Sequence, residues 1–577
     1  MGRRADNSFF HESYEGTRVL VAVPHQDDEI LTSAAMTLRL TEAGAEVFVV
    51  YTTNGDWKYP ARVRYREAAE AASRLGIEAS HLYFLGYGDS YNNEAHDHLF
   101  YYESGQHAST AGHTCTYGAG GTDEYAYMRF GEHHAYNSAN YLRDLMSVIR
   151  EISPDLIICT DFDEHPDHRM LALYMDRAVG LLRREDPSFT PLVWKRLAYA
   201  LAYTAAADYS ATNNPQTLRP HPGITDKYEY DIVDKSIYQW SSRIRIPVPA
   251  DRGGLQHNVI ADALLAHRSQ HVITRADRIL NSDEVYWERR MDSLGCMADV
   301  SATSGDPSYL NDNLLINTQD VDVREEVFGD YCWRPLDSDP DKTATFTWKE
   351  PVMIEQILVS GAIDTASVIS GLQIEMSDGT VFCTGPLPQT GRPLTVDTGK
   401  REGITWCRIR ITACEGEAYG ISEVQFFESR TYRRVIRPFA KLTVQNNFAY
   451  DYYIGMDVKS LRVGCYRYGE TGQLKMSVIS GRSELRDGIL LISEEDSEIV
   501  LGLRNRSSTV WDRVVIHRCS NAQMAHRKRI DKADQRYLKL ARAYKKTSNM
   551  LYILRHQGPG AVVKRTWNNA IKPGIFG

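Results

Sequence analysis

The sequence predicts an α/β fold at its N-terminal end, a Rossmann-like, doubly wound parallel sheet, followed by two β-sandwich-like domains and a basic helical tail. Over about the first 290 residues, runs typical of buried strands alternate with helix patterns, which indicates a parallel sheet with helices on both faces. After Met297, short runs of alternating apolar and polar residues replace this pattern and indicate antiparallel β structure.

The elements of the parallel sheet follow from apolar runs and from the residues that bound them. Buried strands are expected where apolar residues run together, at 19–23, 45–55, 81–87, 155–161 and 196–205. Helices that end on glycine or proline, or that carry a helical apolar pattern, are expected at 30–44, 61–76, 138–154 and 165–184. Residues 90–137 form a long polar insertion, and insertions of this length are usually functional or disordered.

The 577 residues are long enough for three or four domains of roughly 150 residues each. We expect the parallel-sheet domain, the first β-sandwich, a second β domain and the tail at 1–296, 297–430, 431–520 and 521–577, respectively. The strand patterns of the two β domains lie at 342–350, 354–363, 372–378, 408–416, 422–428, 441–447, 461–469, 474–481 and 498–505.

The tail has a charge unlike that of the rest of the chain. From residue 521 to 577 there are 13 Lys and Arg and 2 Asp, a balance of +11, so a total of −9 leaves −20 for the remainder. Ile530, Tyr537, Ala541 and Tyr544 recur there at helical spacing. We expect a helix that docks on the protein's own core, or an amphipathic helix on an anionic membrane surface.

Composition narrows the class of protein. No apolar run reaches about 18 residues, so no transmembrane helix is expected. Nine cysteines occur without a CxxC pair, which favours reduced thiols in the cytoplasm over a disulfide framework. We therefore expect a cytoplasmic protein, peripheral at the inner membrane face if the tail binds lipid, with no nucleic-acid partner.

Two polar clusters follow expected strands. "RVLVAV" runs directly into "PHQDDE", and "DLIICTD" runs toward "HPDH". Burial of such groups costs several kcal/mol each unless something compensates for it. The carboxyl ends of parallel strands line a ligand crevice where the strand order reverses. If these two strands are neighbours there, His25, Asp28 and His168 converge.

Two imidazoles and one carboxylate form a known catalytic zinc set, so we expect His25, Asp28 and His168 to bind one Zn²⁺ ion. Asp27 is adjacent to the ligands and is expected to accept the proton of a water molecule. His165 is expected to donate to the oxyanion or the leaving nitrogen, with Asp167 holding its ring. These roles describe hydrolysis of a carbonyl compound, most simply an amide.

The same motifs resemble those of a known family. Together with "RVRYREAAEAASRLG", "FLGYGDS", "ALLAHRSQ" and "EVYWERR", they are similar to the PIG-L/LmbE zinc deacetylases, which remove acetyl groups from N-acetylglucosamine in lipid-linked or small-molecule glycosides. The resemblance covers about residues 17 to 290. It implies the same metal ligands, the same base and the same role for His165, and it adds Arg64 and Asp89 as substrate-binding residues. Residues 297–428, which end in "GISEVQFFE", resemble a discoidin-like, galactose-binding-type domain.

The insertion carries further groups of interest. Its side chains that commonly bind metals are His107, His113, Cys115, His133 and His134. Their spacings match no zinc pattern, which favours a loop that covers the substrate over a second metal site. Tyr117, Tyr125 and Tyr127 of the same segment are expected to stack on a sugar ring or to pack the loop.

The sequence thus predicts a zinc-dependent hydrolase that removes the N-acetyl group from an N-acetylated amino sugar of the GlcNAc type, within a glycoconjugate or a cell-envelope polysaccharide precursor. One alternative is a zinc amidase that acts on another acylated glycoside or a thiol conjugate. The other is a non-catalytic glycan-binding protein with a vestigial deacetylase fold. The β domains are expected to bind glycan or to serve as a scaffold.

Overall fold

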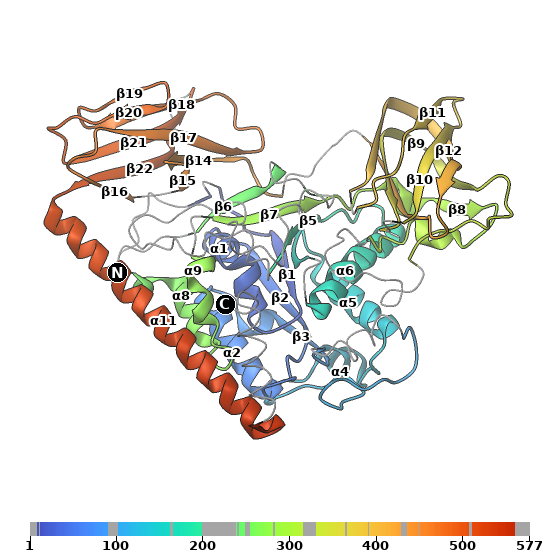
Figure 1. The fold of residues 1–577 in the computed structure, drawn as a ribbon, viewed down its shortest axis with the longest axis horizontal. Coiled ribbons are helices and arrows are strands. Elements are labelled where there is room, and N and C mark those ends of the chain that lie inside the picture. The colour runs from blue at the N-terminus through green and yellow to red at the C-terminus, as the bar shows by residue number, and fades with distance from the viewer. Residues whose placement is uncertain are drawn as a thin grey trace.

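A central sheet domain lies between two β-rich parts, and a long helix runs along one side of it (Figure 1). This computed structural model describes residues 9–10, 12–90, 102–161, 165–198, 238, 242–248, 254–280, 283–315, 331–363, 366–390, 392–428, 435–448, 451–506 and 510–559.

Among these residues, seven strands build the sheet of the N-terminal part, in the order β3-β2-β1-β4-β5-β7-β6. Their bounds are Arg18–Val23 (β1), Glu46–Thr53 (β2), Leu82–Tyr87 (β3), Leu156–Thr160 (β4), Leu192–Arg196 (β5), Ile244–Pro247 (β6) and Asp283–Arg289 (β7). The first five strands pair in parallel, whereas β7 pairs antiparallel with both β5 and β6. The predicted α/β class is confirmed, and the antiparallel edge is an addition to it.

Helices cover both faces of this sheet. The α-helices of the N-terminal part are Asp28–Glu42 (α1), Ala61–Arg74 (α2), Tyr125–Phe130 (α4), Ser138–Ile152 (α5), Pro166–Glu185 (α6), Val259–Ala266 (α8) and Ala276–Ile279 (α9). Short 3-10 helices lie at Ala79–His81 (η1), Leu255–His257 (η4), Val272–Arg275 (η5), Leu294–Met297 (η6) and Pro307–Leu310 (η7). Successive side chains of a strand point to opposite faces. Leu20 and Ala22 of β1 accordingly share a core with α5 and α6, and Val19 and Val21 share one with α1 and α2.

Most of one expected strand lies outside the described part of the chain. The apolar run at 196–205 was expected to form the fifth strand, but β5 occupies the preceding residues and ends at Arg196. Val193 and Trp194 are its buried residues, and β5 pairs in register with β4. Residues from 199 onward in that run lie outside the described part of the chain.

Two β-rich parts follow the sheet domain. The first comprises Asp299–Ala302 (β8), Thr343–Gly361 (β9), Val368–Met376 (β10), Val381–Thr384 (β11), Leu394–Glu415 (β12) and Ile421–Phe427 (β13). All its strand pairs are antiparallel. The runs expected as separate strands at 342–350 and 354–363 form one long strand, β9, whose pairing with β12 shifts register several times.

The second β-rich part consists of two sheets that enclose a common apolar core. Its strands are Phe439–Val444 (β14), Asn447–Phe448 (β15), Asp451–Gly455 (β16), Ser460–Tyr468 (β17), Leu474–Ser480 (β18), Glu484–Arg486 (β19), Ile489–Leu491 (β20), Glu498–Asn505 (β21) and Val510–Cys519 (β22). Leu442 and Val463 from one sheet meet Leu501 and Val514 from the other, which is the arrangement of a sandwich. The domain limits expected at residues 296, 430 and 520 stay predictions.

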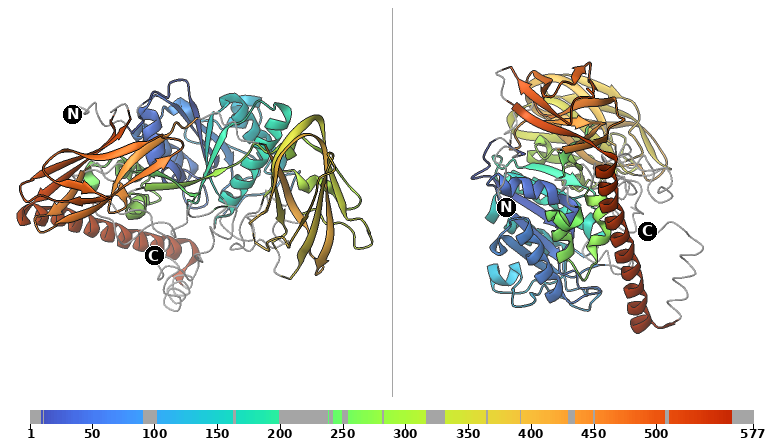
Figure 2. Two further views of the ribbon diagram at one scale, coloured as in Figure 1. Left: turned by 90° about the horizontal axis from the view of Figure 1, so that it is seen from above. Right: turned by 90° about the vertical axis from the view of Figure 1, so that its left-hand side faces the viewer.

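Within the basic tail, Asn521–Gln557 form one helix (α11), which extends from β22 along the sheet domain (Figures 1 and 2). Leu538 is 1% exposed and packs among apolar residues of α1 and α8, and Ile530 and Ala541 pack against the same cluster. Tyr537 and Tyr544 of the expected stripe are exposed. The helix therefore docks through one face and presents another to solvent. None of the described helices is long and apolar enough to cross a membrane.

A buried ion-pair network joins α6 to the sheet, and we expect the loss of one of its charges to destabilise the fold strongly. Asp176 contacts Lys195 at 2.8 Å and Arg289 at 3.0 Å, and all three side chains are buried. Removing one partner of a buried ion pair leaves an uncompensated charge, so Asp176→Asn should lower the free energy of unfolding by about 3–5 kcal/mol. Glu185→Gln, which breaks the exposed pair of the same helix with Arg150, should cost at most about 1 kcal/mol. Urea unfolding measures both, and equal effects would contradict this account.

Candidate active site

The two polar motifs meet where the order of strands reverses. β1 and β4 are neighbours, and Ala22 pairs with Cys159. From this pair the sheet continues through β2 and β3 on one side and through β5 on the other. The adjacency expected from the sequence is confirmed. Asp28 therefore begins α1 and His168 lies in the first turn of α6, both at the carboxyl edge of the sheet.

Asp28 lies between His25 and His168, the two histidines of the predicted ligand set. Asp28 Oδ2 is 2.9 Å from His25 Nδ1 and 3.0 Å from His168 Nε2. Asp28 Oδ1 is buried and accepts no hydrogen bond from the described residues. Burial alone would raise the pKa of Asp28, but His168 and His25 hold this pKa well below its usual range. The carboxylate is therefore ionised and retains an oxygen for another partner.

Two groups of possible metal donors occur among the described residues, and both contain His25 and His165. The first group adds His168, and the second adds Asp89 and Asp167. In each group the donor atoms lie within 4.8 Å of one another. The ligand set of His25, Asp28 and His168 stays a prediction. Its two histidines belong to these groups, whereas Asp28 belongs to neither and contacts both histidines.

The buried carboxylates around His25 would also suit a divalent cation. Four carboxylates, those of Asp27, Asp28, Asp89 and Asp167, are buried here. Arg64 pairs with the first of them at 3.0 Å. Burial of several like charges is costly unless cations or hydrogen bonds compensate for it. A zinc ion bound by imidazole and carboxylate groups would supply such compensation.

Asp167 contacts a histidine other than the expected one. Its Oδ2 is 3.0 Å from His25 Nε2 and 3.9 Å from His165 Nδ1. His165 instead caps α6, because its Nδ1 accepts a hydrogen bond from the backbone N–H of Asp167. A carboxylate on the far nitrogen of a metal-binding histidine fixes the orientation of the ring. This contact differs from the expectation that the Asp167 carboxylate holds His165.

The backbone of Asp27 has an unusual conformation. Its φ is 152°, a value that residues other than glycine rarely adopt. Its N–H donates to Glu29 Oε2. Burial and the neighbouring Asp28 raise the pKa of Asp27, whereas Arg64 opposes this rise. A carboxylate with a raised pKa at the edge of a metal site is well suited to accept a proton.

Arg64 contacts Asp27, and Asp89 contacts His25. Arg64 is buried, and its guanidinium also donates to the backbone oxygens of Gln26 and Gly55. Asp89 Oδ1 is 3.6 Å from His25 Nε2. Burial opposes ionisation of Asp89, but His25 and His165 hold its pKa below the usual range. Both side chains thus border the site, and their roles toward a substrate stay predictions.

The segment that carries these residues also matches a family model. Residues 20–179 match PIG-L, described as GlcNAc-PI de-N-acetylase. The resemblance expected from the motifs is confirmed for this segment.

Several solved structures are similar to parts of the chain. An N,N'-diacetylchitobiose deacetylase from Pyrococcus horikoshii is 19% identical over 32% of this chain and 61% of its own, with a TM-score of 0.21. This chain therefore spans less than two thirds of that enzyme. A deacetylase of the teicoplanin biosynthesis pathway is 17% identical over 47% of this chain and 97% of its own, with a TM-score of 0.28. The CBM32 module of AlyQ is 16% identical over 23% of this chain and 95% of its own, with a TM-score of 0.17. No curated protein matches the chain.

Some contacts near the site were not predicted from the sequence. His267 Nε2 is 2.6 Å from Glu29 Oε1, and Ser269 donates through its N–H and hydroxyl to Glu67. Both partners come from "ALLAHRSQ", which lies after the residues that match PIG-L. Asp56 contacts both Asp89 and the insertion. The resemblance included "ALLAHRSQ", but no local sequence pattern indicated which residues this segment contacts.

Of the insertion, residue 90 and residues 102–137 are described. His133 Nδ1 is 2.6 Å from Glu124 and His134 Nδ1 is 2.7 Å from Asp144, so these histidines pair with separate carboxylates. Tyr127 is exposed and stacks on His133. Among the described residues, both donor groups with metal geometry lie at the strand ends and neither lies in the insertion. The interpretation of the insertion as a loop that covers the substrate stays a prediction.

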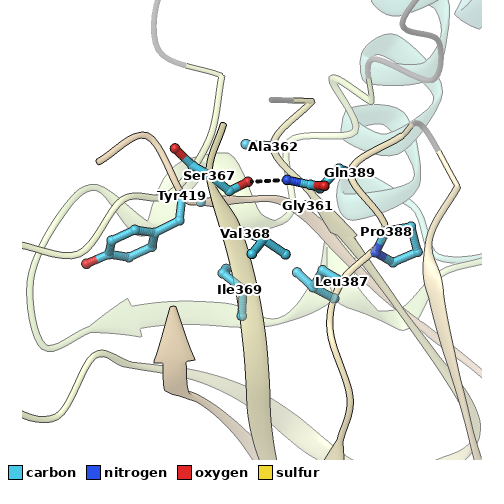
Figure 3. Close-up of a pocket in the computed structure, with 10 residues that line it drawn as sticks. Gly361, Ala362, Ser367, Val368, Ile369, Leu387, Pro388, Gln389 and Tyr419 are labelled. Carbon is cyan, nitrogen blue, oxygen red and sulfur yellow. Dashed lines mark hydrogen bonds between the residues drawn. The ribbon is translucent and has the colours of Figure 1, made fainter. Parts of the chain in front are cut away.

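A small pocket in the first β-rich part contrasts with this site (Figure 3). Its lining is mostly aliphatic, with Val368, Ile369 and Leu387. Gln389 Nε2 donates to the backbone oxygen of Ser367 at 3.1 Å across its rim, as the dashed line shows. The Tyr419 hydroxyl donates to Asp337, which is not among the lining residues. Glycan binding by this part of the chain stays a prediction.

Proposed function

We propose that this protein is a zinc-dependent hydrolase that removes the N-acetyl group from an N-acetylated amino sugar of the GlcNAc type. The observation that carries the proposal is the placement of Asp28 between His25 and His168, with Asp27 beside them, in the segment that matches PIG-L. We further propose that the sugar belongs to a glycoconjugate or a cell-envelope polysaccharide precursor.

His25, Asp28 and His168 would hold the metal ion. When bound there, zinc supplies Lewis-acid polarisation of the acetamide carbonyl and activation of a water molecule. Asp167 orients the ring of His25 through Nε2. The buried Asp28 remains ionised because it contacts two imidazoles. The protein thus presents Asp28 as an ionised ligand.

Asp27 and His165 would act on the reacting atoms. Asp27 accepts a proton from the attacking water as the oxygen adds to the acetamide carbon, and Arg64 keeps its carboxylate oriented. His165 Nδ1 accepts from a backbone N–H, so a neutral ring carries its proton on Nε2 and can donate to the developing oxyanion. Burial and its two neighbouring histidines lower the pKa of His165, which favours that neutral ring. The C–N bond then breaks, and the leaving amine takes up the proton that Asp27 accepted while acetate departs.

The products distinguish this proposal from its alternatives. N-Acetylglucosamine glycosides should release acetate and free amine in equal amounts when the full chain is present. Release from thiol-linked or differently acylated glycosides alone would favour the other zinc amidase. Binding of glycan without any release would favour a vestigial fold. Arg64 and Asp89 would hold the sugar, so their alanine variants should raise KM on the best substrate.

We also propose a cytoplasmic location with a peripheral contact to an anionic membrane through the outer face of α11. The nine cysteines are free thiols, which is usual in reducing compartments. The outer face of the helix carries exposed apolar side chains at helical intervals, at Tyr537, Leu540, Tyr544, Leu551 and Leu554. Ten Lys and Arg stand against two Asp within the helix. This combination suits a lipid surface better than a purely polar polyanion, because the leucines gain little from the latter.

Substitutions on the outer face test this contact. Deleting the helix would expose the core that Leu538 covers, so we choose Leu540→Ser with Leu551→Ser. The unmodified chain should sediment with phosphatidylserine-containing vesicles at low salt and release them at high salt, because each basic residue contributes about 1 kcal/mol that salt screens. The double variant should bind weakly, whereas Leu336→Ser, an exposed leucine elsewhere, should bind normally. Equal binding by all three proteins, or none, would exclude the helix as a membrane contact.

A further inference from the structure

Asp56 joins the insertion to the edge of the proposed active site. It lies in the loop that follows β2, and its two carboxylate oxygens have different partners. Oδ1 accepts the backbone N–H of Asp89 at 3.1 Å, and Oδ2 accepts the hydroxyl of Tyr117 at 2.5 Å. One side chain thus connects residues that lie 33 and 61 positions away along the chain.

Tyr117 is held firmly enough to act as a fixed donor. Its backbone oxygen accepts from Asn54 Nδ2 at 3.0 Å, and its N–H donates to the Gly86 oxygen at 3.3 Å. Gly86 has a φ of 82°, and a Cβ there would lie 2.9 Å from the Tyr117 oxygen. The insertion therefore packs directly on the ends of β2 and β3, which leaves Tyr117 little freedom to move away from Asp56.

Asp89 and Ser90 are held by two carboxylates. Asp56 accepts the N–H of Asp89, and Asp167 Oδ2 accepts the N–H of Ser90 at 3.0 Å. The Asp89 carboxylate faces His25, and its Oδ1 accepts no hydrogen bond from the described residues. Such a buried acceptor remains available to a hydroxyl group of a ligand. The position of that acceptor depends on the backbone that Asp56 and Asp167 fix.

We propose that Asp56 is a positioning residue for substrate binding, that it acts through Asp89, and that Tyr117 of the insertion completes this contact. The inference rests on the proposed function in one respect, namely that Asp89 binds the sugar. The insertion then contributes to affinity by orienting an acceptor and does not have to touch the substrate. Burial raises the pKa of Asp56 and the Tyr117 hydroxyl opposes this rise, so the hydroxyl also helps to keep both oxygens as acceptors.

Tyr117→Phe and Asp56→Asn test the contact with little change of shape. Each should raise KM about tenfold, as expected when a hydrogen bond to a charged group is lost, with kcat within about twofold. Zinc content should not change. Tyr127→Phe removes an exposed hydroxyl of the same insertion and should leave KM unaltered. In an Asp89→Ala background, Tyr117→Phe should have no further effect on KM, whereas additive effects would overturn the inference.

Two outcomes separate this inference from the proposed function. If Asp89→Ala raises KM and both test variants leave it unchanged, Asp56 does not position Asp89 and the inference is wrong. If Asp89→Ala leaves KM unchanged, the substrate contact of Asp89 is wrong. Hydrogen exchange provides a readout that needs no substrate. The peptide that contains Asp89 and Ser90 should exchange faster in Tyr117→Phe than in Tyr127→Phe, and equal exchange would contradict the proposed contact.

Discussion

Asp27→Asn is expected to abolish most of the activity while the protein keeps its metal and its fold. The asparagine amide has the shape of the carboxylate. Its oxygen can still accept the hydrogen bond that Arg64 donates to Asp27 Oδ1 at 3.0 Å. It cannot accept the proton of the attacking water. Loss of a general base typically costs about 10²–10⁴-fold in rate, so kcat should fall by that factor.

Metal content and a remote variant control this experiment. Asp27 is not among the proposed ligands, so zinc per chain should equal that of the unmodified protein. Asp457→Asn makes the same chemical change at an exposed position of the second β-rich part and should leave kcat unaltered. Near-normal turnover by Asp27→Asn on a substrate that the enzyme cleaves would assign the base to another group.

His168→Ala is expected to lose both the metal and the activity. His168 Nε2 lies 3.0 Å from Asp28 Oδ2, and its side chain is completely buried at the start of α6. Its removal takes away one of three ligands, and three protein ligands are usual for a catalytic zinc. Elemental analysis should find about one zinc per chain in the unmodified protein and almost none in the variant.

Two further variants distinguish ligand loss from misfolding. His168→Gln keeps more of the buried volume and should fold, yet it should also lose zinc. His257→Ala removes an exposed histidine of η4 and should retain both metal and activity. Equal zinc in His168→Gln and in the unmodified chain would remove His168 from the ligand set, whatever its effect on rate.

The elements that position the metal site could be predicted because they follow local rules. Apolar runs placed β1 and β4, the polar residues after each run marked where the strands end, and parallel connectivity brought those ends together. The helices that begin at Asp28 and Pro166 follow from the same motifs. His25, Asp28 and His168 therefore meet as expected, since their approach needs only that β1 and β4 are neighbours.

Contacts that depend on packing between distant segments could not be predicted. His267 pairs with Glu29 across 238 residues, and Asp56 meets Tyr117 of an insertion with no periodic pattern. The sequence predicts that Asp167 holds the ring of His165, but in the structure its carboxylate contacts His25 across 142 residues. In α11 the helical spacing was correct, while only tertiary contact separates the docked Ala541 from the exposed Tyr544.

Acetate release before and after metal removal tests the central proposal most directly. The full chain, treated with a chelator and then dialysed, should no longer release acetate from N-acetylglucosamine glycosides. Addition of one equivalent of zinc should restore release, with free amine formed in the same amount, and should fail to do so in Asp27→Asn. Release that persists in the metal-free protein, or a zinc-loaded protein that cleaves no N-acetylated amino sugar, would contradict the assignment of this site as a zinc-dependent N-deacetylase.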